Sequence, residues 1–280
     1  MPRTLIFAIF GLFLANFAAY SYIFAFLKEP ELSVHFLNVG QGDAEIVRTN
    51  RSTILIDAGP SSKVIGEIDS VLLPYDRTID IAILSHPNYD HLAGFLPVLS
   101  RYRVRLFMMT GASHTISEYQ KLKQELNNLK IPVLYAMAGE RIILKRSELL
   151  LLYPERPLLY EKIPPKSLND TSIVAWLYHP ALSVLFTGDI SSKVEKILQI
   201  STSTVLKVPH HGSKYSSSEE FMKKVLPKYA VIEVGRNSYG HPTQEALSRL
   251  AAVGAKVFRT DVDGTVSFFV EDRVVKIRTK

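Results

Sequence analysis

The pattern of apolar and polar positions separates one long uncharged segment from a series of shorter apolar runs. No charged residue occurs between Thr4 and Leu27, a stretch of 24 positions that is long enough for a helix across a bilayer. After a short polar linker, Lys28–Leu32, the apolar runs shorten and alternate between strand-like and helical spacings. This alternation predicts an α/β domain.

The first part of this domain is predicted to begin with strands and to continue with strand–helix alternation. Turns are expected at Gly40–Gly42 and Asn50–Arg51. The predicted helices are Leu92–Tyr102 and Ser117–Leu129, the second with Ser117 as its N-cap. The predicted strands are Val34–Leu37, Ala44–Arg48, Thr53–Ile56, Ile79–Leu84, Val104–Met108, Val133–Tyr135, Arg141–Leu144 and Glu148–Leu152.

A proline-rich loop, Tyr153–Leu168, precedes a second part with the same order of elements. Its predicted strands are Ser172–Tyr178, Ser183–Phe186, Val205–Val208, Val231–Val234 and Lys256–Phe258, with a closing hairpin of Val266–Val270 and Val274–Ile277. Its predicted helices are Ser191–Gln199, Ser218–Val225 and Thr243–Ala252. We therefore expect one domain of two pseudo-equivalent halves over residues 33–280, behind an anchor and linker over residues 1–32.

Two interpretations compete for the uncharged N-terminal segment. One is a cleaved signal peptide with Ala19–Ser21 as the cleavage site. The other is an uncleaved membrane anchor through residues 4–27, which we favour because the apolar run continues past that site. Arg3 precedes the segment and a mixed-charge linker follows it, so the positive-inside rule predicts a single-pass protein of the cell membrane with its domain outside the cytoplasm.

The amino-acid composition excludes several kinds of active site but does not indicate the cellular compartment. The 280 residues include no cysteine, which excludes disulfides, thiolate metal sites and cysteine nucleophiles. A chain without cysteine is compatible with either side of a membrane. The formal net charge of +6 and the pI of about 9.3 are compatible with an anionic partner but do not identify one.

Histidine and aspartate recur where predicted strands end. His86-x-x-x-Asp90-His91 follows the apolar strand Ile79–Leu84, and four other strand ends carry Asp57, Asp189, His210–His211 and His241. Imidazole and carboxylate are the ligands that Zn²⁺ takes from a protein without cysteine, and open α/β sheets place their chemistry at the carboxyl ends of strands. Any one of these positions also fits a turn or cap residue. The five together predict a metal site, whereas His35, His114 and His179 are expected to be structural.

The order of these motifs resembles the metallo-β-lactamase fold superfamily. The residues that carry this resemblance are Asp57-Ala-Gly, His86-x-x-x-Asp90-His91, Thr187-Gly-Asp189 and a later histidine. Further segments resemble the C-terminal hydrolase domain of ComEC-type DNA-uptake proteins, over about residues 33–270. These segments are His35–Asp43, Asn169–Ser172, Leu206–Ser213, Tyr239–Pro242 and Arg259–Asp261.

The resemblance implies an αββα sandwich that holds one or two divalent metal ions, zinc or manganese. The implied ligand positions are His86, Asn88, Asp90, His91, Asp189, His211 and His241. The implied catalytic residues are Asp90, His210 and His211, one of the histidines orienting the substrate or donating a proton to the leaving oxygen. Asp57 would orient a ligand histidine, and Asn169 would support the ligands from nearby.

One position departs from the superfamily pattern, H-x-H-x-D-H, because this chain has Asn88 where the middle histidine is expected. An amide oxygen is a weaker and harder ligand than imidazole. Three outcomes stay open: a weak first metal site, a preference for Mn²⁺ or Mg²⁺, or an ion only on the side of Asp90, His91 and Asp189. Asn169 and Asp170 are the only candidates for the superfamily's intermediate ligand, since no histidine lies between His114 and His179.

The leading functional hypothesis is a membrane-anchored, metal-dependent phosphodiesterase that acts on DNA, most simply single-stranded DNA, with a separate channel protein as a possible partner. Ser213, Lys214 and the run Ser216–Ser218 are candidates for phosphate contacts, although the serine run equally fits an ordinary helix cap. The alternatives are a hydrolase of the same fold that acts on a lactone, an ester or a small phosphoester, and a degenerate domain that only binds nucleic acid or a membrane partner.

Overall fold

The computed structural model describes residues 2–26, 30–49, 52–159 and 163–280. The predicted turn at Asn50–Arg51, most of the predicted linker and the middle of the proline-rich loop lie outside the described residues. The chain divides into two compact units, Met1–Pro30 and Glu31–Lys280.

The described residues of the first unit form one helix, α1 (Arg3–Phe26). The stretch Arg3–Tyr20 is long and apolar enough to cross a membrane. A signal sequence near an N-terminus meets the same criteria, so the anchor and the signal peptide both stay predictions.

The second unit is built on two sheets. The eight-stranded sheet has the order β15-β14-β1-β2-β3-β4-β5-β6 and is parallel from β3 to β6. Its strands are β1 (Leu32–Phe36), β2 (Glu45–Thr49), β3 (Ser52–Ile56), β4 (Thr78–Leu84), β5 (Arg103–Met109), β6 (Val133–Tyr135), β14 (Val266–Glu271) and β15 (Val274–Thr279). The closing hairpin therefore returns to the sheet of the first half, where β14 pairs with β1.

The seven-stranded sheet has the order β13-β12-β11-β10-β9-β8-β7 and is parallel from β10 to β13. Its strands are β7 (Arg141–Leu144), β8 (Ser147–Tyr153), β9 (Val174–His179), β10 (Leu182–Phe186), β11 (Val205–Lys207), β12 (Tyr229–Ile232) and β13 (Lys256–Arg259). Each sheet thus has antiparallel strands followed by parallel ones, as the pattern predicted. The predicted boundary between the halves was wrong, because β7 and β8 precede the proline-rich loop but pair within the second sheet.

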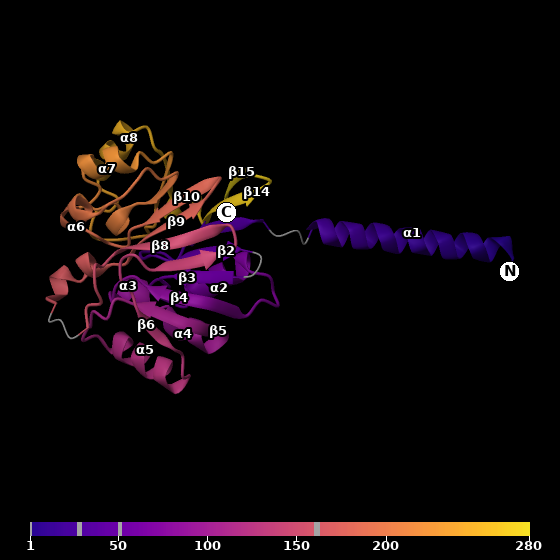
Figure 1. Cartoon of the computed structure of the whole chain (residues 1–280), viewed down its shortest axis with the longest axis horizontal. Coiled ribbons are helices and arrows are strands. Elements are labelled where there is room, and N and C mark those ends of the chain that lie inside the picture. The colour runs from indigo at the N-terminus through magenta and orange to yellow at the C-terminus, as the bar shows by residue number, and fades with distance from the viewer. Residues whose placement is uncertain (1, 27–29, 50–51, 160–162) are drawn as a thin grey trace. The chain divides into compact units, whose positions relative to one another are not determined.

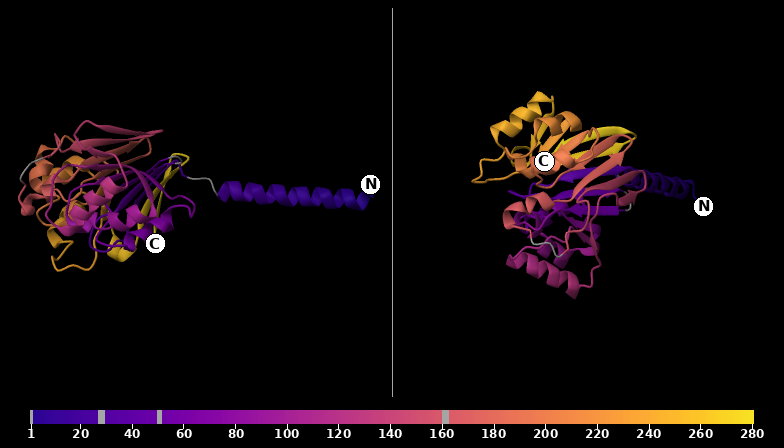
Figure 2. Two further views of the ribbon diagram at one scale, coloured as in Figure 1. Left: turned by 90° about the horizontal axis from the view of Figure 1, so that it is seen from below. Right: turned by 60° about the vertical axis from the view of Figure 1, so that its left-hand side comes forward.

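Helices cover the outer face of each sheet. Figure 1 shows α6, α7 and α8 on one side of the two sheets and α3, α4 and α5 on the other, and the right-hand view of Figure 2 shows the same separation. The helices are α2 (Lys63–Val71), α3 (Tyr89–Leu92), α4 (Phe95–Arg101), α5 (Ser117–Asn128), α6 (Ser192–Ile197), α7 (Glu219–Val225), α8 (Gln244–Ala252) and α9 (Thr260–Asp263). Short 3₁₀ turns occupy Pro165–Ser167, Asn169–Thr171 and Pro209–Gly212.

Three apolar clusters hold these layers together. The central cluster joins the facing sides of the sheets, with Phe36 and Ile83 from one sheet and Val184 and Val231 from the other. A second cluster packs α2, α4 and α5 on the eight-stranded sheet, and a third packs α6, α7 and α8 on the seven-stranded sheet. This order of layers is the predicted αββα sandwich.

Two local predictions in the first half were wrong. The predicted helix Leu92–Tyr102 is interrupted, so that α3 ends at Leu92 and α4 begins at Phe95. A Cβ atom on Gly94 would lie 1.8 Å from the carbonyl oxygen of Ala58, so glycine permits a close backbone approach there. Helix α2 was not predicted, and it buries only Val64 and Ile68.

The predicted N-cap of α5 was also wrong. The cap position is Ile116, and the hydroxyl of Ser117 donates to the Glu118 carboxylate instead of capping the helix. Helix boundaries commonly shift by a residue in this way, and the body of the helix is as predicted.

Candidate metal centre

The carboxyl ends of the parallel strands converge on a cluster of histidine and carboxylate side chains. Asp90, His91, Asp189 and His211 each offer one ligand atom, and these four atoms lie within 4.8 Å of one another. The Nε2 atoms of His91 and His211 are each 3.4 Å from Asp189 Oδ2, and Asp90 Oδ2 is 3.3 Å from His211 Nε2. His91, Asp189 and His211 are buried, and Asp90 is half-buried. The structure therefore brings together four of the predicted ligand residues.

Asp57 fixes the ring of His91. Asp57 follows β3 in a left-handed conformation, with φ of 52°. Its Oδ2 atom lies 2.7 Å from His91 Nδ1 and accepts from the Ser85 hydroxyl at 2.6 Å, and its Oδ1 atom accepts from the Ser85 amide at 2.7 Å. The Ala58 amide donates to the His91 carbonyl at 2.8 Å, which ties the backbone of the two segments together. This contact is the one that the orienting role predicted for Asp57 requires.

A backbone carbonyl group holds the ring of His211 in position. Its Nδ1 atom donates to the Glu233 carbonyl at 2.8 Å. Because a carbonyl can only accept, the proton of the neutral ring lies on Nδ1 and the lone pair lies on Nε2. His210 and His211 both have positive φ, 51° and 53°, which costs about 1–3 kcal/mol at each non-glycine residue. Strain of this size persists where surrounding contacts hold a functional geometry.

The donor atoms of this group suit a divalent cation. Among the described residues, the buried His91 Nε2, His211 Nε2 and Asp189 Oδ1 have no hydrogen-bond partner. An unsatisfied buried polar atom costs about 1–3 kcal/mol, and an ion beside Asp189 Oδ2 would satisfy the two imidazole nitrogens. Two imidazoles and two carboxylates are a donor set that Zn²⁺ and Mn²⁺ accept.

The histidines and carboxylates of the cluster shift one another's pKa values. Burial would lower the pKa of His91, but the carboxylates of Asp189, Asp57 and their neighbours outweigh it and raise the pKa well above its usual value. Burial would raise the pKa of Asp189, but the imidazoles of His211 and His91 hold it well below its usual range. The site thus concentrates negative charge around the two imidazoles, which favours a cation between them.

His86 lies beside this group rather than within it. Its ring is 4.1 Å from the ring of His91 between centroids. Its Nδ1 atom contacts the hydroxyls of Ser85 at 3.0 Å and Ser172 at 3.2 Å, and its buried Nε2 has no partner among the described residues. Burial lowers the pKa of His86 to about 3, with a further lowering from the charge of His91. The ring is therefore neutral at physiological pH.

Asn88, Asn169 and His210 form a chain of hydrogen bonds at the rim. Asn88 Nδ2 donates to Asn169 Oδ1 at 2.7 Å, and Asn169 Nδ2 lies 3.1 Å from His210 Nε2. His210 Nε2 is 3.9 Å from Asp189 Oδ2. The two asparagines that sequence analysis associated with the ligand set thus bond to each other.

His241 lies at the edge of the cluster. Its ring centroid is 5.4 Å from that of His210 and 6.4 Å from that of His211. Asn237 anchors its backbone, accepting from the His241 amide at 3.0 Å and donating to its carbonyl at 2.9 Å. Burial lowers the pKa of His241 to about 4, with a further lowering from His210 and His211. Among the described residues, His241 is not part of the four-residue group.

Sequence analysis missed a second buried cluster under the centre. Lys207 Nζ pairs with the Asp43 carboxylate, donates to the Gly188 carbonyl at 2.9 Å and lies 3.6 Å from Asp189 Oδ1. Glu45 and Glu233 belong to the same buried carboxylate group as Asp43, and burial, assisted by the Asp43 charge, raises the pKa of Glu45 to about 8. The signal that could have found this cluster is a lysine inside the apolar strand β11.

The serine run after His211 behaves as a helix cap. The hydroxyl of Ser218 accepts from the Phe221 amide at 3.3 Å. The amides of Ser217 and Ser218 donate to the two oxygens of Glu195, at 2.5 and 2.9 Å. These amides are therefore occupied by a carboxylate of the chain itself, which favours the cap interpretation over the phosphate contact.

The three histidines expected to be structural have local partners. His35 contacts Ser267 and Ser33, and the Nδ1 atoms of His114 and His179 accept from backbone amides two residues further along the chain. His179 is the last residue of β9 rather than part of a turn.

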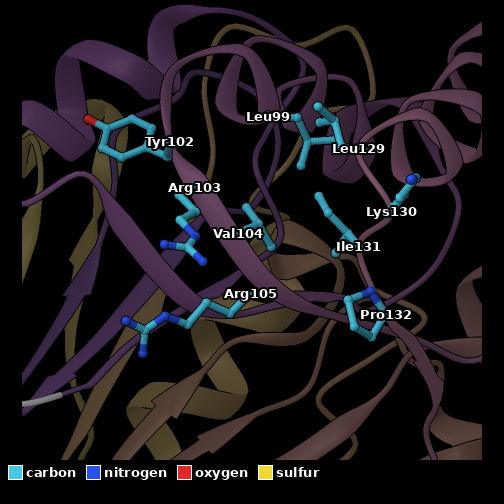
Figure 3. Close-up of a pocket in the computed structure, with 9 residues that line it drawn as sticks. All are labelled: Leu99, Tyr102, Arg103, Val104, Arg105, Leu129, Lys130, Ile131 and Pro132. Atoms are coloured by element: carbon cyan, nitrogen blue, oxygen red, sulfur yellow. The ribbon is translucent and has the colours of Figure 1, made fainter.

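A pocket of the domain lies away from the candidate metal centre. A pocket of about 450 Å³ opens at the amino end of β5, at the strand end opposite the histidines (Figure 3). The described residues that line it are basic or apolar apart from one tyrosine: Leu99, Tyr102, Arg103, Val104, Arg105, Leu129, Lys130, Ile131 and Pro132. Among these lining residues there is no histidine or carboxylate, so this pocket offers no ligands for a metal ion.

The amino-acid sequence of the chain is similar to those of known competence-related proteins. The chain is 28% identical to ComE operon protein 3 of Bacillus subtilis (strain 168) over 267 residues, which cover 87% of this chain and 34% of that protein. It is 29% identical to Competence protein ComA of Neisseria gonorrhoeae over 254 residues, which cover 86% of this chain and 33% of that protein. The chain therefore spans about a third of the length of these relatives, and the predicted resemblance to competence proteins is confirmed.

The fold has solved counterparts and a family model. The metallo-beta-lactamase fold protein YhfI from Bacillus subtilis superposes with a TM-score of 0.56 at 12% identity, over 82% of this chain and 97% of that chain. A likeness at this identity shows the fold alone. The family model described as metallo-beta-lactamase superfamily matches residues 37–236. Because this match covers more than half of the chain and includes the four-residue group, the chain belongs to the metallo-beta-lactamase superfamily.

Proposed function

We propose that this protein is a metal-dependent phosphodiesterase that cuts DNA. The observation that carries the proposal is the group of four donor atoms from Asp90, His91, Asp189 and His211, buried and within 4.8 Å of one another. The likeness to Competence protein ComA supports DNA as the substrate. An ion held by these residues would act as a Lewis acid on a phosphoryl oxygen and would lower the pKa of water.

The residues of the chain then have separate tasks. Asp57 and the Glu233 carbonyl hold the two ligand imidazoles in position. His210 is 29% exposed and accepts a hydrogen bond at Nε2 from Asn169, so its neutral ring carries a proton on Nδ1. That proton is available for the leaving oxygen of a cleaved phosphodiester.

Exposed aromatic residues next to the centre support a polynucleotide over a small ester. Tyr89, Tyr215 and Tyr239 are 50%, 67% and 73% exposed, and each lies within four residues of a site histidine or aspartate. The Tyr239 ring is 5.9 Å from the His241 ring, and Lys214 Nζ is 5.3 Å from the Tyr215 ring. Exposed rings beside cations are what unpaired bases stack on, so we propose single-stranded DNA as the substrate.

We also propose that α1 anchors the protein in the cell membrane, with the hydrolase domain at the outer face. The support is the apolar segment, Arg3–Tyr20, together with the charges that flank it in the sequence. We also propose a channel protein as a partner in DNA uptake, and the likeness to Competence protein ComA supports this role.

The direct test is an endonuclease assay on the full chain in detergent, with Mn²⁺ or Zn²⁺ and an end-labelled single-stranded oligonucleotide. We expect cleavage that requires metal and is lost in Asp189→Asn, with slower cleavage of a duplex of the same sequence. Hydrolysis of small esters or lactones without cleavage of DNA would replace the proposal with the small-molecule alternative. Metal binding with no hydrolysis of either substrate would refute the enzyme.

A further inference from the structure

The two sides of the centre are unequal. On one side, Asp90, His91, Asp189 and His211 present four donor atoms to a common point. On the other side, the nearby side chains are His86, Asn88, Asn169 and His210, and among the described residues they form no group of three close histidine or carboxylate donors with another residue.

On the second side, the Asn169 oxygen and the His210 ring nitrogen are occupied by hydrogen bonds within this group, whereas His86 Nε2 has no partner among the described residues. The Asn169 carbonyl oxygen accepts from Asn88 Nδ2 at 2.7 Å, and His210 Nε2 accepts from Asn169 Nδ2 at 3.1 Å. Each bond uses an oxygen or a ring nitrogen that a cation would need. A second ion would have to break both bonds before Asn169 and His210 could bind it, and without them His86 is the one imidazole of this side with a free ring nitrogen among the described residues.

The distribution of carboxylates also favours binding of one divalent ion over binding of two. The carboxylates of Asp90 and Asp189 balance one divalent cation on the first side. The second side offers only neutral amides and imidazoles, and amide oxygens are weak ligands for transition metals. A second divalent ion would therefore add charge to a buried region without a carboxylate of its own.

We propose that this centre holds a single ion, and that Asn88, Asn169 and His210 form a donor arm that takes the place of a second ion by binding a non-bridging phosphate oxygen. The three side chains are half-buried and reach solvent, and each retains an N–H group beyond those in the two bonds above. Hydrogen bonds from such groups to a phosphate oxygen are charge-assisted. The second clause of this inference rests on the proposed phosphodiesterase function, and the first does not.

Metal counting tests the single ion. The metal-free full chain is titrated with Zn²⁺ and, separately, Mn²⁺ by calorimetry, and bound metal is measured by mass spectrometry after gel filtration. We expect one ion per chain, and two in the double variant Asn88→His with Asn169→His. Asn128→His on the exposed face of α5 is the matched control and should bind one.

Two ions of comparable affinity in the unmodified chain would overturn the inference. One ion in the double variant would also overturn it, because the amides would then not be what excludes the second ion. Neither count depends on nuclease activity. A chain that binds one ion and cuts no DNA would leave the single ion standing while the proposed function fails.

Binding of a non-cleavable phosphorothioate oligonucleotide to the metal-loaded chain tests the donor arm. We expect Asn169→Ala to weaken this binding by about tenfold to a hundredfold, the size of a lost hydrogen bond to a charged group, with the metal count unchanged. Asn169→Gln should recover part of the affinity because it keeps the amide. Unchanged affinity in Asn169→Ala at a metal count of one would overturn the arm.

Discussion

The ammonium of Lys207 contacts the carboxylate of Asp43 in an ion pair whose two side chains are both fully buried. The pair borders the candidate metal centre, because Lys207 is also 3.6 Å from Asp189 Oδ1 and donates to the Gly188 carbonyl. It therefore connects the floor of the site to the turn that presents Asp189.

Breaking this pair should destabilise the fold. Lys207→Met leaves the buried Asp43 carboxylate without its lysine partner, with the rings of His91 and His211 beside it at 3.7 and 3.2 Å. Loss of one partner of a buried pair costs about 3–5 kcal/mol. We expect a decrease of this size in the free energy of unfolding of the metal-free chain, measured by urea denaturation. The exposed pair of Lys223 and Glu219 provides the control, and Lys223→Met should change stability by less than about 0.5 kcal/mol. Equal, small changes in both variants would contradict a structural role for Lys207.

The Lys207 pair also shows where prediction from the sequence ends. Strand-end positions such as His91 and Asp189 were predictable because parallel strands align their carboxyl ends, so a pattern along the chain becomes a cluster in space. A lysine inside an apolar strand suggests a buried partner, but it does not tell which residue that partner is. Its burial depends on Asp43, which lies 164 positions earlier and reaches it only through the packing of two sheets.

The fold could likewise be predicted where it depends on a repeating pattern of apolar residues. Periodicity located the strands and most helices, since each buries one face against a sheet. It failed at Gly94, where the helix breaks because of a backbone contact with Ala58, and at α2, which buries two side chains. Nor does periodicity show that Asn88 and Asn169, 81 positions apart, bond to each other.

Removing the carboxylate of Asp57 should weaken metal binding without removing a ligand. Asp57→Ala frees the Nδ1 side of His91, so the ring loses its orientation and its basicity. We expect about a tenfold to hundredfold increase in the Kd for Zn²⁺, measured by competition with a chelating dye. Asp69→Ala is the control, because Asp69 pairs with Arg77 and Arg101 on the surface. An unchanged Kd in Asp57→Ala would show that the His91 ring needs no support.

His35 should make stability fall in acid. Burial lowers the pKa of His35 to about 3, with smaller contributions from the charges of Arg48 and Arg278, whereas the unfolded value is about 6.5. Between these values the unfolded chain binds the proton and the folded chain does not, so stability is full above about pH 6.5 and falls as the pH drops toward 3.

A comparison of the unmodified chain with His35→Gln isolates this contribution, because acid effects of other groups are common to both proteins. We expect the free energy of unfolding of the unmodified chain to fall more steeply in that window, with a difference in slope of up to about 1.4 kcal/mol per pH unit. Parallel curves would mean that His35 is protonated without cost in the folded protein.

Tyr239 should contribute to the binding of single-stranded DNA through stacking. Its ring is 73% exposed and 5.9 Å from the His241 ring, so it offers a stacking surface beside the candidate centre. Loss of one base–aromatic stack is worth about 1–3 kcal/mol, and Tyr239→Ala should weaken binding of a single-stranded oligonucleotide to the metal-loaded chain by roughly tenfold to a hundredfold. Fluorescence anisotropy with a labelled oligonucleotide measures this change.

The sequence offers two controls for this measurement. Tyr75, between α2 and β4, is also 73% exposed but precedes the amino end of its strand, away from the centre, so Tyr75→Ala should leave affinity unchanged. Tyr239→Phe should retain affinity because stacking needs the ring and not the hydroxyl. Equal losses in Tyr239→Ala and Tyr75→Ala would indicate a nonspecific effect, and full affinity in Tyr239→Ala would remove Tyr239 from the DNA path.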